Sequence, residues 1–442
     1  MTNDQCECII DILENYDEAI CIYRVPPNLR QVNAKAYTPQ FISVGPFHHG
    51  KHELKAMEVK KKIYQHEFQK SRNLTRAFSE FKDYIEKTEG DIRRCYAAAG
   101  DSDSLPRGKE FVDMIELDAI FIMEFFLRSV ESEKNGDEYK DDYVLSKPWL
   151  KKGIELDLIL LENQIPFSIL TELYTFVDVN YQQAERRDNI TKDMAGGFLD
   201  LACEYFKHYC PVKNAEHLPV KEKEVRHLTD LIRSFYIPIE LKSCLTTSPD
   251  DNTICSATEL QEAGVTFKAV SDRCLLDIKF NKPKSLNYLP CLSFLLFNKS
   301  VKPSLELPKL TVESKTENVL QNLIALKQCH SPNHQYICNY IALIDGLIYS
   351  KEDLGLLLRR NVIVNRLGNH AAVKKMINSL RKEIVISSTC YQELITKLKG
   401  HHNAIWNRRM ETLSSVYFRD LWRTSLTIVG LAVLAFTFIP FL

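Results

Sequence analysis

The chain has 442 residues, of which 45% are hydrophobic and 26% are charged, a composition typical of a folded globular protein rather than a disordered one. Its 57 basic and 58 acidic residues give a net charge of −1, so the sequence offers no overall field that would attract nucleic acid. Nucleic acid is therefore not an expected partner.

Residues 1–20 form an acidic leader. They lack a basic region followed by an apolar stretch, so they do not predict a secretory signal, and we expect the 13 cysteines to be reduced thiols. We predict three parts: the leader over 1–20, a helical domain over 21–422 in the cytoplasm, and a membrane anchor over 424–442.

Hydrophobic periodicity predicts an amphipathic helix over residues 53–87. Two further segments, 111–130 and 154–177, are much more apolar, but carboxylates interrupt both, so we expect them in the core of the soluble body. In the second segment Pro166 has no N–H to donate and disfavours a helical residue before it. A break is therefore predicted at residues 163–166.

Over residues 266–290 the apolar residues alternate as in strands, and we predict two short strands joined by a turn at 281–284. Helical spacing returns over 317–330, 336–348, 352–367, 371–381 and 388–422. The predicted fold class is mainly α: a multi-helical globular body with a small antiparallel β element and a C-terminal transmembrane helix.

The range from Thr424 to Leu442 carries no charge, and a helix of this length reaches roughly 28 Å at about 1.5 Å per residue. Four arginines precede it, at Arg408, Arg409, Arg419 and Arg423. The positive-inside tendency then predicts a single-pass, tail-anchored protein with its body on the cytoplasmic side and the lipid bilayer as a partner. The sequence does not indicate whether this bilayer is the plasma membrane or an endomembrane. The alternative is a hydrophobic helix buried in the body.

Histidines and cysteines suggest two places for a metal ion or for proton transfer. The first is the pair His48 and His49, near His52, in a turn set by Gly45, Pro46 and Gly50. The second comprises Cys329, His330, His334 and Cys338. Zinc requires three or four converging ligands, which neither pattern provides by itself, so we favour structural roles and predict no metal and no cofactor.

Asp118, Asp157 and Glu162 lie within apolar stretches, where a desolvated carboxyl has a raised pKa and can act as a general acid or base. The alternative is that each carboxyl pairs with an arginine or accepts hydrogen bonds from a neighbouring loop. No nucleophile, phosphate-binding loop or cofactor motif accompanies them, so we favour the structural alternative.

The run IYRVPPNLRQVNAKAYTPQFISVGPFHHGKHELKAMEVKK, residues 22–61, resembles the opening signature of a plant-specific family called domain of unknown function 247. Further blocks in the same order also resemble that family, including LDLILLENQIPFSIL, SATELQEAGVTFK and ICNYIALIDGLI. The signature residues that match are Arg24, Pro26, Gly45, Pro46, His48, His49, Gly50, Glu58, Glu162, Asn163, Gln164, Pro166 and Glu259.

The resemblance implies a membrane-associated plant protein with a C-terminal hydrophobic segment, and links some members to self-incompatibility in grasses. It supplies no catalytic residues, and we expect the signature residues to be architectural. Our first hypothesis is therefore a non-enzymatic platform that binds another protein in recognition or signalling. The alternative is a hydrolase that uses Asp157 and Glu162 with His48 or His49, and it predicts a cleft between these groups.

Overall fold

The computed structural model describes residues 19–71, 74–97, 105–134, 139–184, 197–210, 212, 220, 224–238, 254–282, 302–330, 336–382, 384, 386, 389–404 and 429–430. The chain forms two compact units. The first comprises Met1–Lys242, Glu313–Cys338 and Lys382–Val385, and the second comprises Ser243–Val312, Asn339–Arg381 and Ile386–Leu442.

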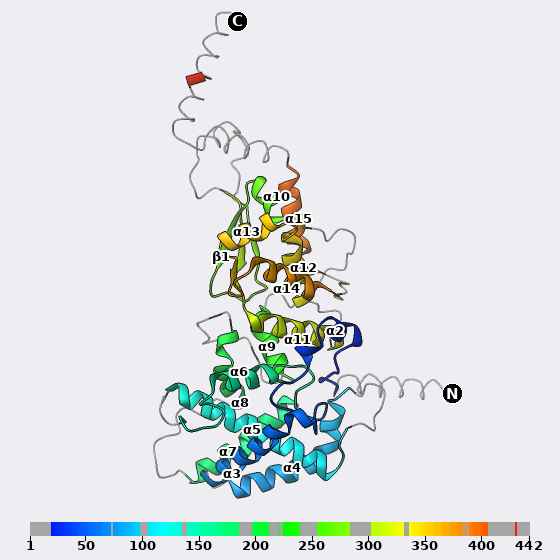
Figure 1. Ribbon diagram of the computed structural model, residues 1–442, viewed down its shortest axis with the longest axis vertical. Coiled ribbons are helices and arrows are strands. Elements are labelled where there is room, and N and C mark those ends of the chain that lie inside the picture. The colour runs from blue at the N-terminus through cyan, green and yellow to red at the C-terminus, as the bar shows by residue number, and fades with distance from the viewer. Residues whose placement is uncertain are drawn as a thin grey trace, which may run out of the picture. The chain divides into compact units, whose positions relative to one another are not determined.

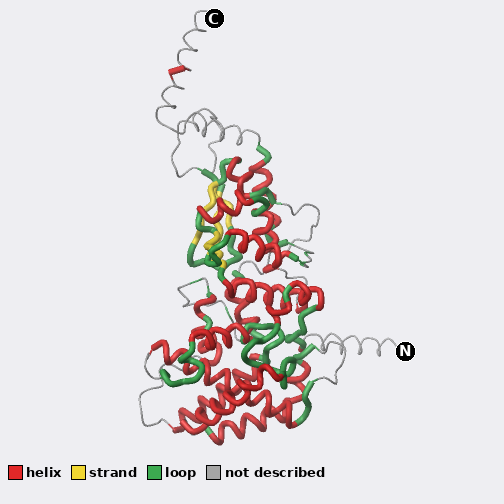
Figure 2. Tube along the Cα trace, in the orientation of Figure 1, coloured by secondary structure: helices red, strands yellow, loops and turns green. Residues whose placement is uncertain are grey.

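Helices make up the regular structure of the first unit (Figures 1 and 2). They are α2 (Pro27–Val32), α3 (Lys55–Ser71), α4 (Thr75–Arg94), α5 (Lys109–Lys134), α6 (Pro148–Asp157), α7 (Phe167–Ala184), α8 (Gly197–Tyr205), α9 (Leu228–Tyr236) and α11 (Ser314–His330). Short 3-10 helices are η1 (Ala34–Tyr37), η2 (His52–Leu54) and η4 (Lys207–Tyr209).

Helix α5 is the centre of this unit, because α3, α4, α7 and α8 all pack against it (Figure 1). All its residues from Phe111 to Ser129 are buried except Asp113. Phe126 stacks on Tyr205 of α8 with ring centroids 4.1 Å apart. Burying one such aromatic side chain contributes about 2 kcal/mol, and several of them hold the helices around α5. The prediction of a core helix over 111–130 is confirmed.

The single helix predicted over 53–87 is wrong, because α3 ends at Ser71 and α4 begins at Thr75. Leu74, which is only 1% exposed, precedes α4, and Phe68 of α3 lies against Phe78 of α4 with ring centroids 5.7 Å apart. The break lets the chain reverse, so that two apolar faces pack on α5 instead of one. Residues 72–73 lie outside the described part.

A break in the 154–177 segment is confirmed, but it is longer than predicted. Helix α6 ends at Asp157 and α7 begins at Phe167, so residues 158–166 form a non-helical link, which we call the α6–α7 connection. Its residues 158–166 are all buried. A buried loop must find partners for its backbone groups, and this requirement shapes the site described below.

The second unit combines helices with all the named strands. Its helices are α10 (Ala257–Glu262), α13 (Lys351–Arg359), α14 (His370–Arg381) and α15 (Gln392–His402), and α12 (Tyr336–Leu347) continues into it from the first unit. Its strands are β1 (Thr266–Val270), β2 (Lys279–Asn281), β3 (Ser304–Pro308), β4 (Leu310–Val312) and β5 (Ile363–Asn365).

The predicted small antiparallel β element is found in part, because the strands also form parallel pairs. Strand β3 lies between β1, to which it is parallel with Thr266 opposite Ser304, and β2, to which it is antiparallel with Phe280 opposite Leu305. Strands β4 and β5 form a separate parallel pair. The second predicted strand falls within residues 283–301, which lie outside the described part.

Helices near the C-terminus are shorter than predicted. Helix α13 ends at Arg359 instead of 367, since Asn361 adopts φ +56°, and β5 follows. Helix α15 covers 392–402 of the predicted 388–422. Residues 405–428 lie outside the described part.

The fold class is mainly helical, as predicted, but its transmembrane component is wrong. None of the described helices combines the length and the apolar character that a bilayer span requires. Even α5, with 26 residues, is interrupted by carboxylates. Within 424–442 the structure describes only Val429 and Gly430, so the predicted ends Thr424 and Leu442 lie outside the described residues.

Candidate functional site

The α6–α7 connection is held in one shape largely by the side chain of Gln164. Its Nε2 donates to the carbonyl oxygens of Leu158 at 2.7 Å and Leu160 at 2.8 Å. Its Oε1 accepts a hydrogen bond from the N–H of Leu228 at 2.9 Å, in the first turn of α9. One buried amide therefore satisfies three backbone groups and joins the connection to a second helix.

Asp157, at the end of α6, binds the backbone of the signature segment (residues 22–61). Its carboxylate accepts hydrogen bonds from the N–H groups of Gln40 at 3.0 Å, Phe41 at 2.6 Å and Ile42 at 2.9 Å. Burial raises the pKa of Asp157 to about 6, although the three N–H groups favour the charged carboxylate. The carboxyl therefore acts as an acceptor for three consecutive backbone donors.

Asn163 continues this pattern along the same segment. Its Oδ1 accepts from the N–H of Val44 at 2.7 Å. Its Nδ2 donates to the carbonyl oxygens of Ile42 and Asp157, both at 3.0 Å. Residues 40–44 have no strand partner, and side chains supply the hydrogen bonds that a neighbouring strand would otherwise provide.

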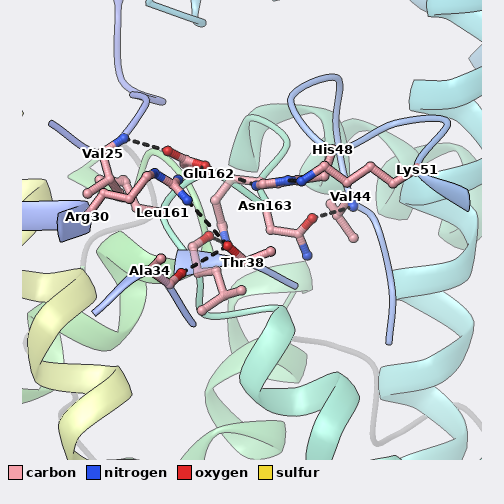
Figure 3. Close-up of polar contacts among 12 residues, drawn as sticks. Val25, Arg30, Ala34, Thr38, Val44, His48, Lys51, Leu161, Glu162 and Asn163 are labelled. Carbon is pink, nitrogen blue, oxygen red and sulfur yellow. Dashed lines mark hydrogen bonds and ion pairs between the residues drawn. The ribbon is translucent and has the colours of Figure 1, made fainter. Parts of the chain in front are cut away.

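Glu162 contacts two separate parts of the signature segment, one near its start and one at His48 (Figure 3). Its Oε1 accepts from the N–H of Val25 at 2.7 Å, and its Oε2 pairs with Arg30 of α2 and lies 3.1 Å from His48 Nε2. Lys51 Nζ lies 2.7 Å from His48 Nδ1. The hydrolase hypothesis brings His48 and Glu162 together, and the structure places them in contact.

The pKa values of both members of this pair are lowered, for different reasons. Burial lowers the pKa of His48. Burial alone would raise the pKa of Glu162, but His48, Arg30 and the Val25 N–H lower it. Both side chains are only 3% exposed, and both oxygens of Glu162 have partners within the protein.

Asp118 and Lys61 form the second part of this arrangement. Asp118 of α5 accepts a hydrogen bond from the N–H of Gly45 at 2.8 Å. Lys61 of α3 donates to Asp118, to Glu58 and to the carbonyl oxygen of Ser43. The ammonium group is buried but is balanced by two carboxylates, as a buried charge requires.

Gly45 is placed where no side chain fits. Its φ is +71°, and a Cβ there would lie 2.2 Å from the carbonyl oxygen of Gln164. Tyr96 donates to that same oxygen at 3.1 Å. The close approach of backbone to backbone explains the glycine, and the buried Pro46 follows it.

The remaining signature residues of the first unit have simpler roles. The Arg24 guanidinium lies 4.4 Å from the Phe47 ring centroid, and Pro26 is the N-cap of α2. Pro166 ends the α6–α7 connection. His49 and Gly50 do not join the network, since His49 Nε2 lies 4.0 Å from Glu110 and Gly50 is exposed.

Glu259 lies in the second unit, apart from the other signature residues. It forms a capping box with Ser256 at the start of α10, in which the Ser256 N–H donates to Glu259 Oε2 at 2.9 Å.

Sequence reasoning missed two residues of this arrangement. Lys61 belongs to a run of three lysines, a pattern typical of a solvated helix face, so no signal distinguished it. Asn322 of α11 donates to the carbonyl oxygen of Ala36 at 2.8 Å and accepts from the N–H of Leu161 at 2.9 Å. Its place between apolar residues of the 317–330 helix was a usable signal.

His330, from the second suggested metal position, makes polar contacts instead. Its Nδ1 lies 2.8 Å from the Tyr23 hydroxyl and 3.2 Å from Arg226. His334 lies outside the described residues.

We call the contacts of Asp118, Asp157, Glu162 and Asn163 with residues 22–61 the signature network. Acid–base groups are present, but their oxygens accept hydrogen bonds from backbone groups or pair with cations of the protein. The arrangement is therefore suited to holding the signature segment in place.

Comparison with known proteins places the chain among plant proteins. The model of the family DUF247, described as a plant protein of unknown function, matches residues 22–436. UPF0481 protein At3g47200 of Arabidopsis thaliana is 24% identical, covering 88% of this chain and 79% of the relative. Putative UPF0481 protein At3g02645 of the same plant is 22% identical, covering 93% and 88%. No solved structure matches the chain.

Proposed function

The chain belongs to the DUF247 family of plant proteins of unknown function, and from this premise we propose that it acts by binding another protein, without catalysis, in recognition or signalling. The signature network supports this proposal more than any other feature. The residues with acid–base chemistry are turned inward and bound to backbone amides, and His48 and Glu162 are each 3% exposed. A hydrolase would need these groups within reach of substrate.

An exposed surface on α3 is where we propose that the partner docks. Val59 and Ile63, one turn apart on α3, are 60% and 41% exposed, and Tyr143, whose ring contacts Lys60 of the same helix, is 46% exposed. Lys60 Nζ lies 3.9 Å and Lys147 Nζ 3.7 Å from the centroid of the Tyr143 ring. We call these five residues the α3 surface.

The α3 surface combines apolar side chains with an aromatic ring between two lysines. Tyrosine is enriched among the interface residues that contribute most to binding. The complementary partner is a protein segment that carries apolar side chains next to acidic ones. Such binding weakens as salt is added, because the charged contacts are screened.

A capture experiment with matched variants tests the proposal. Tagged full-length protein, the double variant I63S/Y143S and the control variant Y349S are incubated with plant extract, and captured proteins are quantified by mass spectrometry. Tyr349 is 85% exposed and lies in the other unit. We expect at least one protein that wild type and Y349S retain and I63S/Y143S loses. Equal capture by all three, or none above background, contradicts docking on this surface.

The α3 variants keep the fold in this experiment, because exposed side chains away from caps and cores change stability by about 0.5 kcal/mol or less. Circular dichroism of all three proteins checks this. For the hydrolase alternative, the decisive variant is Glu162→Gln. Loss of a measured hydrolytic activity in E162Q, with unchanged thermal unfolding, would contradict the proposal.

A further inference from the structure

Three side chains of the second unit that sequence reasoning did not connect lie together. Cys255, Glu259 and His402 each offer one ligand atom, a thiol sulfur, a carboxylate oxygen and a ring nitrogen, and these atoms all lie within 4.8 Å of one another. Cys255 precedes α10, Glu259 lies in its first turn, and His402 is the last residue of α15. We propose that they bind one zinc ion.

The two helices are fixed to each other independently of any metal. Helix α10 packs against α15, and His401 Nε2 lies 2.9 Å from the carbonyl oxygen of Ala263, the C-cap of α10. His402, the next residue, lies near the start of α10, close to Cys255 and Glu259.

The contacts that Glu259 and His402 make outside this cluster are compatible with metal binding. Glu259 Oε2 accepts from the Ser256 N–H in the capping box, which leaves Oε1. His402 Nδ1 lies 3.2 Å from Asn403 Oδ1, so the ring would bind the metal through Nε2. A ring nitrogen that donates to an outer oxygen while the other binds metal is the usual arrangement of histidine ligands.

The chemistry of the three ligands determines which metal ion the site favours. A thiolate favours zinc over magnesium and calcium, which take oxygen ligands. Three protein ligands and one water complete a tetrahedron, with sulfur about 2.3 Å and nitrogen about 2.0 Å from zinc. On binding, the Cys255 thiol loses its proton to solvent as the Zn–S bond forms, so affinity rises with pH. The ion would fasten the end of α15 to the start of α10.

Metal binding to the full-length protein tests the proposal. Protein stripped with a chelator is titrated with Zn²⁺ by calorimetry, and with Co²⁺ while absorption is recorded. We expect one equivalent of Zn²⁺, a rise in unfolding temperature, and with Co²⁺ a thiolate-to-cobalt charge-transfer band. C255S should lose the band and H402N the stoichiometric binding.

Two kinds of control variant distinguish the loss of a metal ligand from a change in folding. Glu259→Gln retains the capping box, because glutamine serves at that position, but removes the charged ligand. E262Q on the exposed end of the same helix and C274S in the same unit should bind like wild type. The proposal is overturned if wild type binds no Zn²⁺ stoichiometrically, or if C255S, E259Q and H402N bind it as wild type does.

Discussion

At the scale of single residues, Asp157, Glu162 and Asn163 provide for the signature segment what a neighbouring strand provides in a sheet. Their oxygens accept hydrogen bonds from the N–H groups of Val25, 40–42 and Val44. A buried N–H without an acceptor costs about 1–3 kcal/mol, so each of these side chains stabilises a backbone that has no regular structure of its own.

Replacing Asp157 by alanine leaves the N–H groups of Gln40, Phe41 and Ile42 without their acceptor. We expect the free energy of unfolding to fall by about 3 kcal/mol or more. Urea unfolding followed by circular dichroism measures this loss. The control Asp141→Ala removes an exposed carboxyl and should change stability by about 0.5 kcal/mol or less. Similar values for the two variants would refute the role of Asp157.

Gly45 and Gly50 form a natural matched pair, with φ values of +71° and +75°. Gly50→Ala should cost about 1 kcal/mol, because only the backbone conformation is unfavourable and nothing lies within 4 Å of the added Cβ. Gly45→Ala should cost about 4 kcal/mol or more, because its Cβ also meets the Gln164 carbonyl oxygen. Thermal unfolding of both variants checks the difference, and equal losses would show that the close approach is absent.

His227 should make the protein less stable in acid. It is the N-cap of α9, where Nδ1 accepts from the Asp230 N–H at 3.3 Å, and burial lowers its pKa from 6.5 to about 4. Between these values the unfolded chain binds a proton that the folded chain does not. The free energy of unfolding therefore falls as the pH falls, by about 2.5 kcal/mol between pH 7.5 and pH 4.5.

The variant His227→Asn isolates this effect, since asparagine is a good N-cap and does not titrate. Urea unfolding at the two pH values should show a loss about 2.5 kcal/mol smaller in the variant than in wild type. Asp157 titrates in the same window in the opposite direction, but it contributes equally to both proteins. Parallel pH dependences would exclude a buried neutral His227.

At the scale of elements, Asp353 joins two helices of the second unit. Its Oδ2 accepts from the N–H of Ser350 at 2.7 Å in the capping box of α13. Its Oδ1 accepts from both the N–H and the hydroxyl of Thr258 in α10, each at 2.7 Å. Hydrogen bonds from Thr258 and Ser350 lower the pKa of Asp353 against the effect of burial.

Asp353→Ala removes a helix cap and the contact with α10 together. We expect a loss of about 2–3 kcal/mol, because the Thr258 and Ser350 donors both lose their acceptor. Thermal unfolding and limited proteolysis of the second unit measure it. The exposed neighbour Glu352→Ala is the control. If the two variants unfold at the same temperature, the joining role of Asp353 is excluded.

Periodicity predicted helices well where a single helix runs without a break, as in α5, α11 and α14. Periodicity failed where contacts between segments far apart in the sequence determine where an element ends or which strands pair. The 53–87 pattern continues across the turn at Leu74, because both arms of that turn pack on the same helix. Strand β3 was not predicted, since its partner β1 lies more than thirty residues away and no local turn signals a parallel pair.

For the site, sequence reasoning gave the residues but not their partners. Buried carboxylates in apolar stretches pointed to Asp118, Asp157 and Glu162, and the structure shows that backbone N–H groups accompany all three. The distances along the chain between donors and acceptors, 115 residues for Ile42 and Asp157, leave no local pattern. A lysine in a basic run, Lys61, gives no sign that it is buried.

At the scale of the whole molecule, the two units are built in different ways. The first surrounds α5 with helices and uses the signature network to hold its irregular segment. The second combines two small sheets with capped helices and carries the proposed zinc site. Binding by the α3 surface and metal binding by α10 and α15 are therefore separable by variants in different units.

Hydrogen exchange of backbone amides tests most directly whether side chains hold the signature segment. The N–H groups of Val25, Val44, Gly45 and residues 40–42 belong to no helix or strand. If the signature network exists, they exchange as slowly as the amides of α5, and D157A makes those of 40–42 exchange fast. Rapid exchange of these amides in the wild-type protein would contradict the central claim.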